Sequence, residues 1–520
     1  MRQKLMRIVM LSSALSALAL ATASPALAST ETPLVTVSST DPYAGCANDG
    51  QSGTVTVNAE VEPQVAVNPH TADNIIGAWQ QDRWSNGGAH GLLAGFSTDG
   101  GKTWGESQLP FSGCVTGSNP VLDPFTGTPY NRASDPWVSI GPDGTAYAVG
   151  LLATETTVSG GGNNDTGVAA ATSTDGGKSW GNARLVKSDQ GTSPVFEFTH
   201  FFNDKESVTA DPIHAGTAYV AWDRLTAPSH SPDAALRAHA FRGPTWFSKT
   251  TDGGKTWTGT RPIFDPGQNS QTIGNVIVVN PRTGALYDFF EQFQTTGSPK
   301  FTPRGFSVGF VSSSDGGTTW SGPTTVAAQQ FVTDTDPNTG AALRTGKGLP
   351  SVAIDPSTGQ LYVVWSDDRF TGGTINQIVI STSTDGGKTW TAPAVISKAT
   401  GKPAFTPTVA VNSAGVVGVT YYDLRNLPAG DTTTLPTDYW FTASSHHGTS
   451  FGDETHIAGS FDLLKAPNAG GFFVGDYEAL GVSGAAFVPF FVQAEPSATT
   501  PPPPPATTPP TDVFTNSVTP

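Results

Sequence analysis

Short apolar runs alternate with turn residues along almost the whole chain, and one arrangement recurs. An apolar run, a turn rich in Pro, Gly and Asn, and a second run of β-branched and aromatic residues follow one another, as in LPSVAIDPSTGQLYVVWSDDR at 349–369. This pattern is typical of a β-hairpin. Seven copies occur, at 62–84, 134–151, 205–224, 275–293, 349–369, 405–425 and 475–495.

A second sequence recurs after the hairpins, between a third predicted strand and a fourth. One copy is STDGGKTW at 383–390, and a decayed copy is SSHHGTSF at 444–451. The Asp side chain can accept hydrogen bonds from turn N–H groups, the Gly pair allows positive φ, and the Trp can pack between strands. Because these residues recur, we interpret them as structural and not catalytic. The five full copies carry Asp99, Asp175, Asp252, Asp315 and Asp385.

Four antiparallel strands repeated about every 70 residues predict an all-β fold, a β-propeller of four-stranded blades. Seven blades are favoured if residues 511–518, after the Pro-rich linker at 496–510, form the third strand of the last blade. The N-terminal residues 54–60 would then supply its outer strand, so that both chain ends close the ring and leave no free edge. The alternative is six blades, with the seventh hairpin appended and 496–520 disordered.

Composition agrees with this fold and indicates export. The chain has 59 Gly, 41 Pro and only 13% charged residues, which excludes a helical bundle or coiled coil. Residues 1–28 have a basic start, an apolar run and a small-residue ending, as in a signal peptide cleaved between Ala28 and Ser29. No later run is long enough to span a membrane. We therefore expect the propeller, 29–495, to be secreted, in an extracellular or periplasmic location.

The charge balance argues against one class of binding partner, and the two cysteines predict a disulfide bond. Removal of the signal peptide leaves 24 basic against 43 acidic residues, a balance of −19, which disfavours nucleic acid. Cys46 and Cys114 are the two cysteines, and in an exported protein we expect one disulfide between them. We expect a monomer that uses no cofactor and no metal.

The recurring S-x-D-x-G-x-T-W sequence resembles the Asp-box, or BNR, repeat of the sialidase (neuraminidase) superfamily. The resemblance covers 97–451 and implies a β-propeller and an exo-α-sialidase-like glycosidase acting without a metal on terminal acidic sugars of extracellular glycans or polysaccharides. In that family three Arg residues bind the substrate carboxylate, a Tyr paired with a Glu is the nucleophile, and an Asp is the acid/base. Similar boxes occur in lyases and non-catalytic receptors. A glycan- or protein-binding propeller and a uronate lyase, with Tyr477 or His200 as base, therefore stay open.

Topology places the starts of first strands and the ends of second strands on one face, which is rich in acidic and basic residues. Arg83, Arg369 and Arg425 stand at equivalent strand ends, each closely preceded by Asp. They are either ion pairs that tie neighbouring blades or a substrate-binding carboxylate clamp. None of the seven first strands contains an Arg, where the family has one.

Residues that break the repeat are the catalytic candidates. Tyr477 begins the last hairpin, where no other copy has a Tyr, and Glu291 and Glu206 stand earlier in the chain. A carboxylate within reach of the phenol could take its proton and make it nucleophilic. The order of Tyr477 with Glu291 or Glu206 resembles the family's Tyr–Glu pair. We assign Asp135, at the start of the second repeat, as the acid/base.

Overall fold

The computed structural model describes residues 29–39, 41–46, 51, 53–117, 119–154, 165–190, 200–227, 242–296, 302–494 and 511–520. The predicted signal peptide and the Pro-rich linker lie outside these residues. Strands dominate the described part of the chain, where one short 3₁₀ turn, Leu463–Lys465, is the only helical element. The protein is therefore all-β, as its turn-rich composition predicted.

The strands pair in successive antiparallel units of four, each following chain order. The first three units are β3 (Val55–Val67), β4 (Ile75–Trp84), β5 (Ala89–Ser97) and β6 (Gly105–Gln108); β7 (Arg132–Ile140), β8 (Ala146–Thr154), β9 (Asp165–Ser173) and β10 (Gly181–Asp189); and β11 (His200–Ala210), β12 (Ala218–Ala227), β14 (Thr245–Thr250) and β15 (Thr258–Phe264). A short strand, β13 (Arg242–Gly243), links β12 to the next unit.

Three more units continue the pattern. They are β16 (Ser270–Val279), β17 (Leu286–Thr295), β18 (Pro303–Ser313) and β19 (Thr324–Ala328); β21 (Ser351–Ile354), β22 (Leu361–Asp367), β23 (Gln377–Ser383) and β24 (Ala394–Val395); and β25 (Ala404–Val411), β26 (Val417–Asp423), β27 (Pro436–Ser444) and β28 (Thr455–Asp462). Two short strands, β20 (Leu343–Arg344) and β29 (Phe472–Phe473), pair in parallel outside these units.

The last unit combines both ends of the chain. β30 (Ala479–Ser483) pairs with β31 (Ala486–Ala494), which pairs with β32 (Thr511–Thr515). The outer place beside β32 belongs to β2 (Val35–Thr36), while β1 (Thr30–Glu31) pairs with β33 (Val518–Thr519).

The assignment of 54–60 to this outer place is wrong. Those residues begin the long inner strand β3, where Val55 and Thr56 pair with Trp84 and Arg83 of β4. They meet β32 through a parallel bridge between Ala59 and Thr511. The alternating residues before Glu62 continue its strand, and the sequence pattern alone did not show that the two runs are one.

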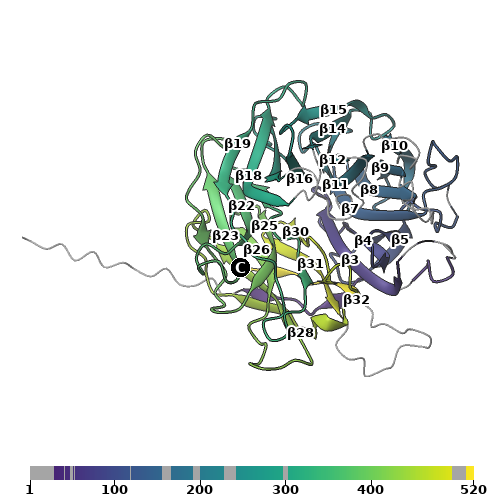
Figure 1. Ribbon diagram of the computed structural model, residues 1–520. Coiled ribbons are helices and arrows are strands. Elements are labelled where there is room, and N and C mark those ends of the chain that lie inside the picture. The colour runs from purple at the N-terminus through teal and green to yellow at the C-terminus, as the bar shows by residue number, and fades with distance from the viewer. Residues whose placement is uncertain are drawn as a thin grey trace, which may run out of the picture.

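The inner strands of the units meet around a common centre. Each of β3, β7, β11, β16, β21, β25 and β30 contacts the next, and β30 contacts β3. Figure 1 shows the units following one another around that centre, with the yellow C-terminal strands beside the purple β3. Residues near the starts of the inner strands therefore come from distant parts of the sequence to one place.

Large side chains on the second strands fill the space between sheets. Trp79, Trp222, Trp365 and Tyr421 have no exposed surface, and clusters of apolar residues join neighbouring units. One cluster packs Ala78 and Leu92 of the first unit against β-strand residues of the second. Burial of this apolar area is the main stabilising contribution.

The recurring turns have the predicted hydrogen bonds. At the first, Asp99 Oδ1 accepts from the backbone N–H of Thr103 at 3.0 Å, and Trp104 Nε1 donates to Gly101 O at 3.1 Å. The other four full copies repeat the bond from the residue four places after the Asp. Side-chain and backbone hydrogen bonds from Thr389 lower the pKa of Asp385 to about 2. These carboxylates are occupied within their own turns, in agreement with a structural role.

The predicted disulfide is confirmed. Cys46 and Cys114 are bonded, with their Cα atoms 5.4 Å apart, across a sequence separation of 68 residues. Tyr43, just before Cys46, is fully buried and donates a hydrogen bond from its hydroxyl to Leu92 O at 3.1 Å. The disulfide bond thus fastens the N-terminal segment, which includes β2, to the first unit.

Candidate active site

A β-bulge near the start of several inner strands positions the central side chains. The strand register shifts around Glu62, Asp135, Lys205, Gly274 and Thr406, and each of these residues has φ between 48° and 72°. Positive φ is unusual for a residue with a Cβ, and such strain concentrates at functional sites. The bulge interrupts the alternation of the strand and turns its side chains towards the centre.

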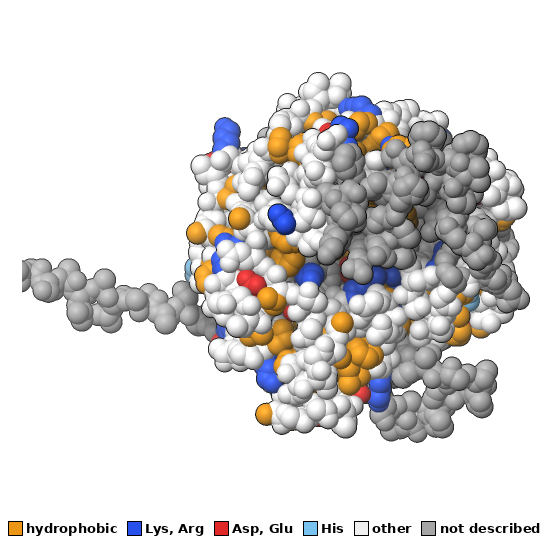
Figure 2. Space-filling view, viewed as in Figure 1, with side chains coloured by type: hydrophobic (Ala, Val, Ile, Leu, Met, Phe, Trp, Pro, Cys, Tyr) orange, Lys and Arg blue, Asp and Glu red, His pale blue; other side chains and the backbone are white. Residues whose placement is uncertain are grey.

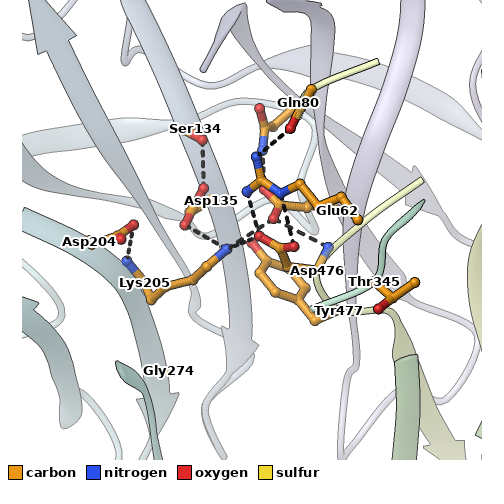
Figure 3. A network of polar contacts seen from close by, with 12 residues as sticks. Glu62, Gln80, Ser134, Asp135, Asp204, Lys205, Gly274, Thr345, Asp476 and Tyr477 are labelled. Atoms are coloured by element: carbon orange, nitrogen blue, oxygen red, sulfur yellow. Dashed lines mark hydrogen bonds and ion pairs between the residues drawn. The ribbon is translucent and has the colours of Figure 1, made fainter. Parts of the chain in front are cut away.

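Lys205 lies at the middle of the resulting cluster (Figure 3). Its ammonium is 2.8 Å from Asp476 Oδ2, 3.1 Å from Glu62 Oε1 and 3.4 Å from Asp135 Oδ2. The four side chains come from β11, β3, β7 and the segment before β30, and each is less than a tenth exposed. Burial opposes the charge of Lys205, but the surrounding carboxylates hold its pKa well above the usual value. The cluster is therefore a buried ion network that joins four units.

Arg344 supplies a second cation. Its Nε donates to Asp476 Oδ1 at 3.1 Å and its Nη2 to Asp476 Oδ2 at 2.5 Å, which is a bidentate pair. The Arg344 side chain is 34% exposed, which makes it more accessible to solvent than Lys205 or the acids of the cluster. Figure 2 shows Lys and Arg side chains at the surface near the middle of this face. A ligand above the cluster would meet positive charge.

Arg83 is the third cation near the cluster, and it packs against the same aromatic ring as Arg344, that of Phe473. Its guanidinium lies 5.0 Å from the centre of the Phe473 ring, and that of Arg344 lies 4.4 Å from it. Arg83 Nη1 donates to Gln80 Oε1 at 2.7 Å, and Gln80 in turn donates to Glu62. Arg83 Nε is buried without a hydrogen-bond partner. Burial and the neighbouring Arg344 lower the pKa of Arg83.

Tyr477 faces the cluster next to Asp476. Its hydroxyl donates to Pro136 O at 3.4 Å, its ring is 5.5 Å from that of Trp137, and Lys205 Nζ is 5.3 Å from its centre. Burial, together with the charges of Glu62 and other carboxylates, raises the pKa of Tyr477 well above its usual value. The phenol is thus protonated at neutral pH and needs a base to become a nucleophile.

The carboxyl groups of the cluster divide into two protonation states. Although burial opposes it, Lys205 lowers the pKa of Asp135, and Arg344 and Lys205 hold that of Asp476 well below its usual range. Burial and Asp135 raise the pKa of Asp204 to about 7 and that of Glu62 to about 8. An ionised and a protonated carboxyl side by side are what acid/base chemistry requires.

Glu206 is a further buried carboxyl group with a raised pKa. Burial, and then the charge of Asp135, raise its pKa well above the usual value. Neither carboxylate oxygen of Glu206 has a hydrogen-bond partner, although both are buried. Its charge also contributes to the raised pKa of Tyr477, so the two residues are electrostatic neighbours. Buried carboxyl oxygens without a hydrogen-bond partner are uncommon in proteins.

The structure gathers some of the sequence candidates and separates others. Tyr477, Asp135, Glu206 and Arg83 belong to the central cluster. Glu291 lies beside it and interacts with Lys347.

Arg369 and Arg425 are held by acids of their own units. Arg369 Nε donates to Asp367 Oδ1 at 2.7 Å, and Arg425 Nε donates to Asp423 Oδ2 at 2.7 Å. Arg425 also binds Glu454, at 2.6 Å. Within the described part of the chain, no ion pair or hydrogen bond connects Arg369 or Arg425 to the Lys205 cluster.

Sequence reasoning passed over Arg344 and gave no role to Lys205, Glu62 or Asp476. Arg344 lies in the short β20, which belongs to no repeat. The sequence did contain one signal for the bulges that carry Glu62 and Asp135. Each of these residues is followed by a Pro, and Pro inside a strand marks a bulge.

No protein-family model and no curated protein sequence matches the chain. Among solved structures, a Dyadobacter fermentans protein of unknown function is 12% identical, with 94% of this chain and 99% of that one covered and a TM-score of 0.45. A Penicillium chrysogenum α-L-arabinanase complexed with arabinobiose is also 12% identical, with 94% and 98% covered and a TM-score of 0.44. The intramolecular trans-sialidase of Ruminococcus gnavus is 14% identical, with 86% and 93% covered and a TM-score of 0.37.

Two further observations bear on the site and its surroundings. In the described part of the chain, no three His, Cys, Asp or Glu side chains are grouped in a way that could hold a metal ion. None of the described residues forms a helix with the length and apolar character needed to cross a membrane.

Proposed function

We propose that this chain is an exported, sialidase-like glycoside hydrolase with a seven-bladed propeller, which removes a terminal acidic sugar at the centre of the ring. The observation that carries the proposal is the Lys205 cluster, where ionised and protonated carboxyl groups, a phenol and three cations converge. The ring of contacting inner strands supports the blade count.

The cations provide the basis for selecting an acidic sugar. Arg83, Lys205 and Arg344 gather at one place in a chain whose formal charge is −16. Asp135 and Asp476 balance two of these charges, whereas Glu62 is protonated at neutral pH. The remaining positive charge favours a ligand carboxylate, and Arg344, the most exposed of the three cations, is the one that can bind it.

The proposed reaction uses the difference in protonation between the carboxyl groups of the cluster. Tyr477 Oη attacks the anomeric carbon while Glu206 takes the phenol proton; the ionised form of Glu206 is the one that reacts, and its raised pKa makes that form a strong base. The bond from that carbon to the leaving oxygen breaks, and Asp204 donates its proton to that oxygen. Water then attacks the anomeric carbon and gives its proton to Asp204, the tyrosyl–sugar bond breaks, and Glu206 returns its proton to the Tyr477 oxygen.

This scheme modifies the role of Asp135. Lys205 holds Asp135 ionised, so it suits stabilisation of positive charge that develops on the sugar ring. Asp204, whose pKa lies near neutrality, is the better proton donor.

The test is a panel of fluorogenic sialosides and uronosides, with identification of the product. Release of a saturated free acidic sugar supports the proposal. An unsaturated product that absorbs in the ultraviolet would instead show a lyase. Saturable binding of these glycans without any turnover would show a binding module, and either of these two results overturns the proposed hydrolysis.

A further inference from the structure

A second group of polar and aromatic side chains lies next to the Lys205 cluster, across the strap formed by residues 344–348. In the middle of the strap, a Cβ added to Gly346 would lie 1.8 Å from Asp476 O. At its C-terminal end, a Cβ added to Gly348 would lie 2.5 Å from Glu291 Oε2. The strap therefore packs against both Asp476 and Glu291, and the two sites are immediate neighbours.

Two phenylalanines pack together, and one of them, Phe331, lies beside Lys347, whose charge acts on Glu291. The ring centres of Phe306 and Phe331 are 4.4 Å apart with an angle of 50° between the planes, and both rings are partly exposed. Lys347 Nζ lies 5.9 Å from the centre of the Phe331 ring and donates to Thr333 Oγ1. An aromatic surface with a cation at its edge suits a sugar, because the ring packs against the apolar face while hydroxyl groups reach the polar groups.

Glu291 completes this second site without a role in the proposed chemistry. Its side chain is buried, and burial raises its pKa to about 8 despite the opposing charge of Lys347. A protonated carboxyl both donates and accepts hydrogen bonds, as does a sugar hydroxyl. The base that serves Tyr477 in the proposed scheme is Glu206, so Glu291 is free to bind substrate.

We propose that Glu291, Phe331 and Lys347 form a second sugar subsite, which holds the sugar on the leaving-group side of the scissile bond. The inference rests on the proposed function and deepens it, since it makes the substrate an oligosaccharide or polysaccharide. Arg344 and Lys347 are three residues apart, which in an extended chain is at most about 10 Å. That separation suits neighbouring sugar rings of one chain.

The test compares longer and shorter ligands that share the terminal acidic sugar. The probes are 3′-sialyllactose with methyl α-sialoside, and digalacturonate with methyl galacturonide. Binding is measured by calorimetry in an Asp204→Asn background, alone and with Phe331→Ala or Lys347→Met. Phe125→Ala, which truncates an exposed Phe in the loop between β6 and β7, is the matched control.

We expect each subsite variant to weaken binding of the longer ligand about tenfold, the value of one aromatic or polar contact, and the methyl glycoside by less than about twofold. Phe125→Ala should change neither. If a longer ligand binds but Phe331→Ala and Lys347→Met leave its affinity unchanged, or weaken both ligands equally, the subsite is wrong while the proposed function stands. If neither pair of ligands binds the protein with the native Phe331 and Lys347, the proposed function itself fails.

Discussion

Replacement of Lys205 by Met removes the cation that three carboxyl groups share. The side chains have similar lengths, so the change takes away charge and hydrogen bonds and leaves most of the packing. Asp476 and Asp135 would then face each other inside the protein without Lys205 between them. Arg344 still binds Asp476, so Asp135 loses a larger share of its stabilising charge interactions than Asp476 does.

The size of the effect follows from the distances. With an effective dielectric constant of about 20, the attraction is about 6 kcal/mol for the 2.8 Å contact with Asp476 and about 5 kcal/mol for the 3.4 Å contact with Asp135. Relief from burying the ammonium offsets several kcal/mol of this. We expect a net loss of about 3 to 5 kcal/mol, as is usual when one partner of a buried ion pair is removed.

The loss should depend on pH. Asp135 and Asp476 have lowered pKa values in the folded protein, so their ion pairs contribute stability above the pKa of the unfolded carboxyl. That contribution disappears as the pH falls through the lowered folded pKa values. Lys205→Met should therefore be most harmful at neutral pH and progressively less harmful under acidic conditions.

The assay is guanidinium unfolding followed by Trp fluorescence, at pH 7.5 and at pH 2.5, which lies below the pKa of the unfolded carboxyl. Lys398→Met is the matched control, because its partner Asp453 is largely exposed and such a pair contributes about 0 to 1 kcal/mol. A loss below about 1 kcal/mol for Lys205→Met at pH 7.5, or a loss equal at both pH values, would refute the ion-network reasoning.

Three other predictions follow from separate features. Cys46→Ser with Cys114→Ser should lower the free energy of unfolding by about 4 kcal/mol, because the bond closes a loop of 68 residues; an unchanged unfolding midpoint would contradict this. Asp385→Ala should speed hydrogen exchange at the Thr389 amide, which loses its acceptor, and unchanged exchange there would show that the turn needs no Asp. Hydrolysis should decline as the pH rises through about 7, because Asp204 must be protonated to donate, and a pH–rate profile flat to pH 9 would exclude that role.

Much of the fold could be predicted because repetition amplifies weak signals. One hairpin such as 349–369 is ambiguous alone, but recurring copies indicated all-β architecture and the turn chemistry of Asp385. The outer strand of the last unit was misplaced because β2, at Val35–Thr36, is only two residues long and has no pattern. Its position depends on contacts with β32, which no local feature of the sequence encodes.

The site was harder to predict because bulges and connecting segments form it. Repeat equivalence led to Arg369 and Arg425, whose partners are acids close by in their own units. Arg344 lies outside every repeat, and only the folded chain brings it to Asp476, 132 residues away. Lys205 stands next to the sequence candidate Glu206, but its contacts with acids of three other units depend on ring closure.

The most direct test of the account is the rate at which the purified protein releases free acidic sugar from sialosides and uronosides, with Tyr477→Phe and Asp204→Asn measured beside it. We predict hydrolysis by the native protein, and a fall in kcat of about 10² to 10⁴ for Asp204→Asn, the usual contribution of a general acid. The kcat of Tyr477→Phe, which lacks the nucleophilic oxygen, should fall at least as far. Native hydrolysis that neither substitution slows, or no hydrolysis of any acidic glycoside, would contradict the assignment of the Lys205 cluster as an active site.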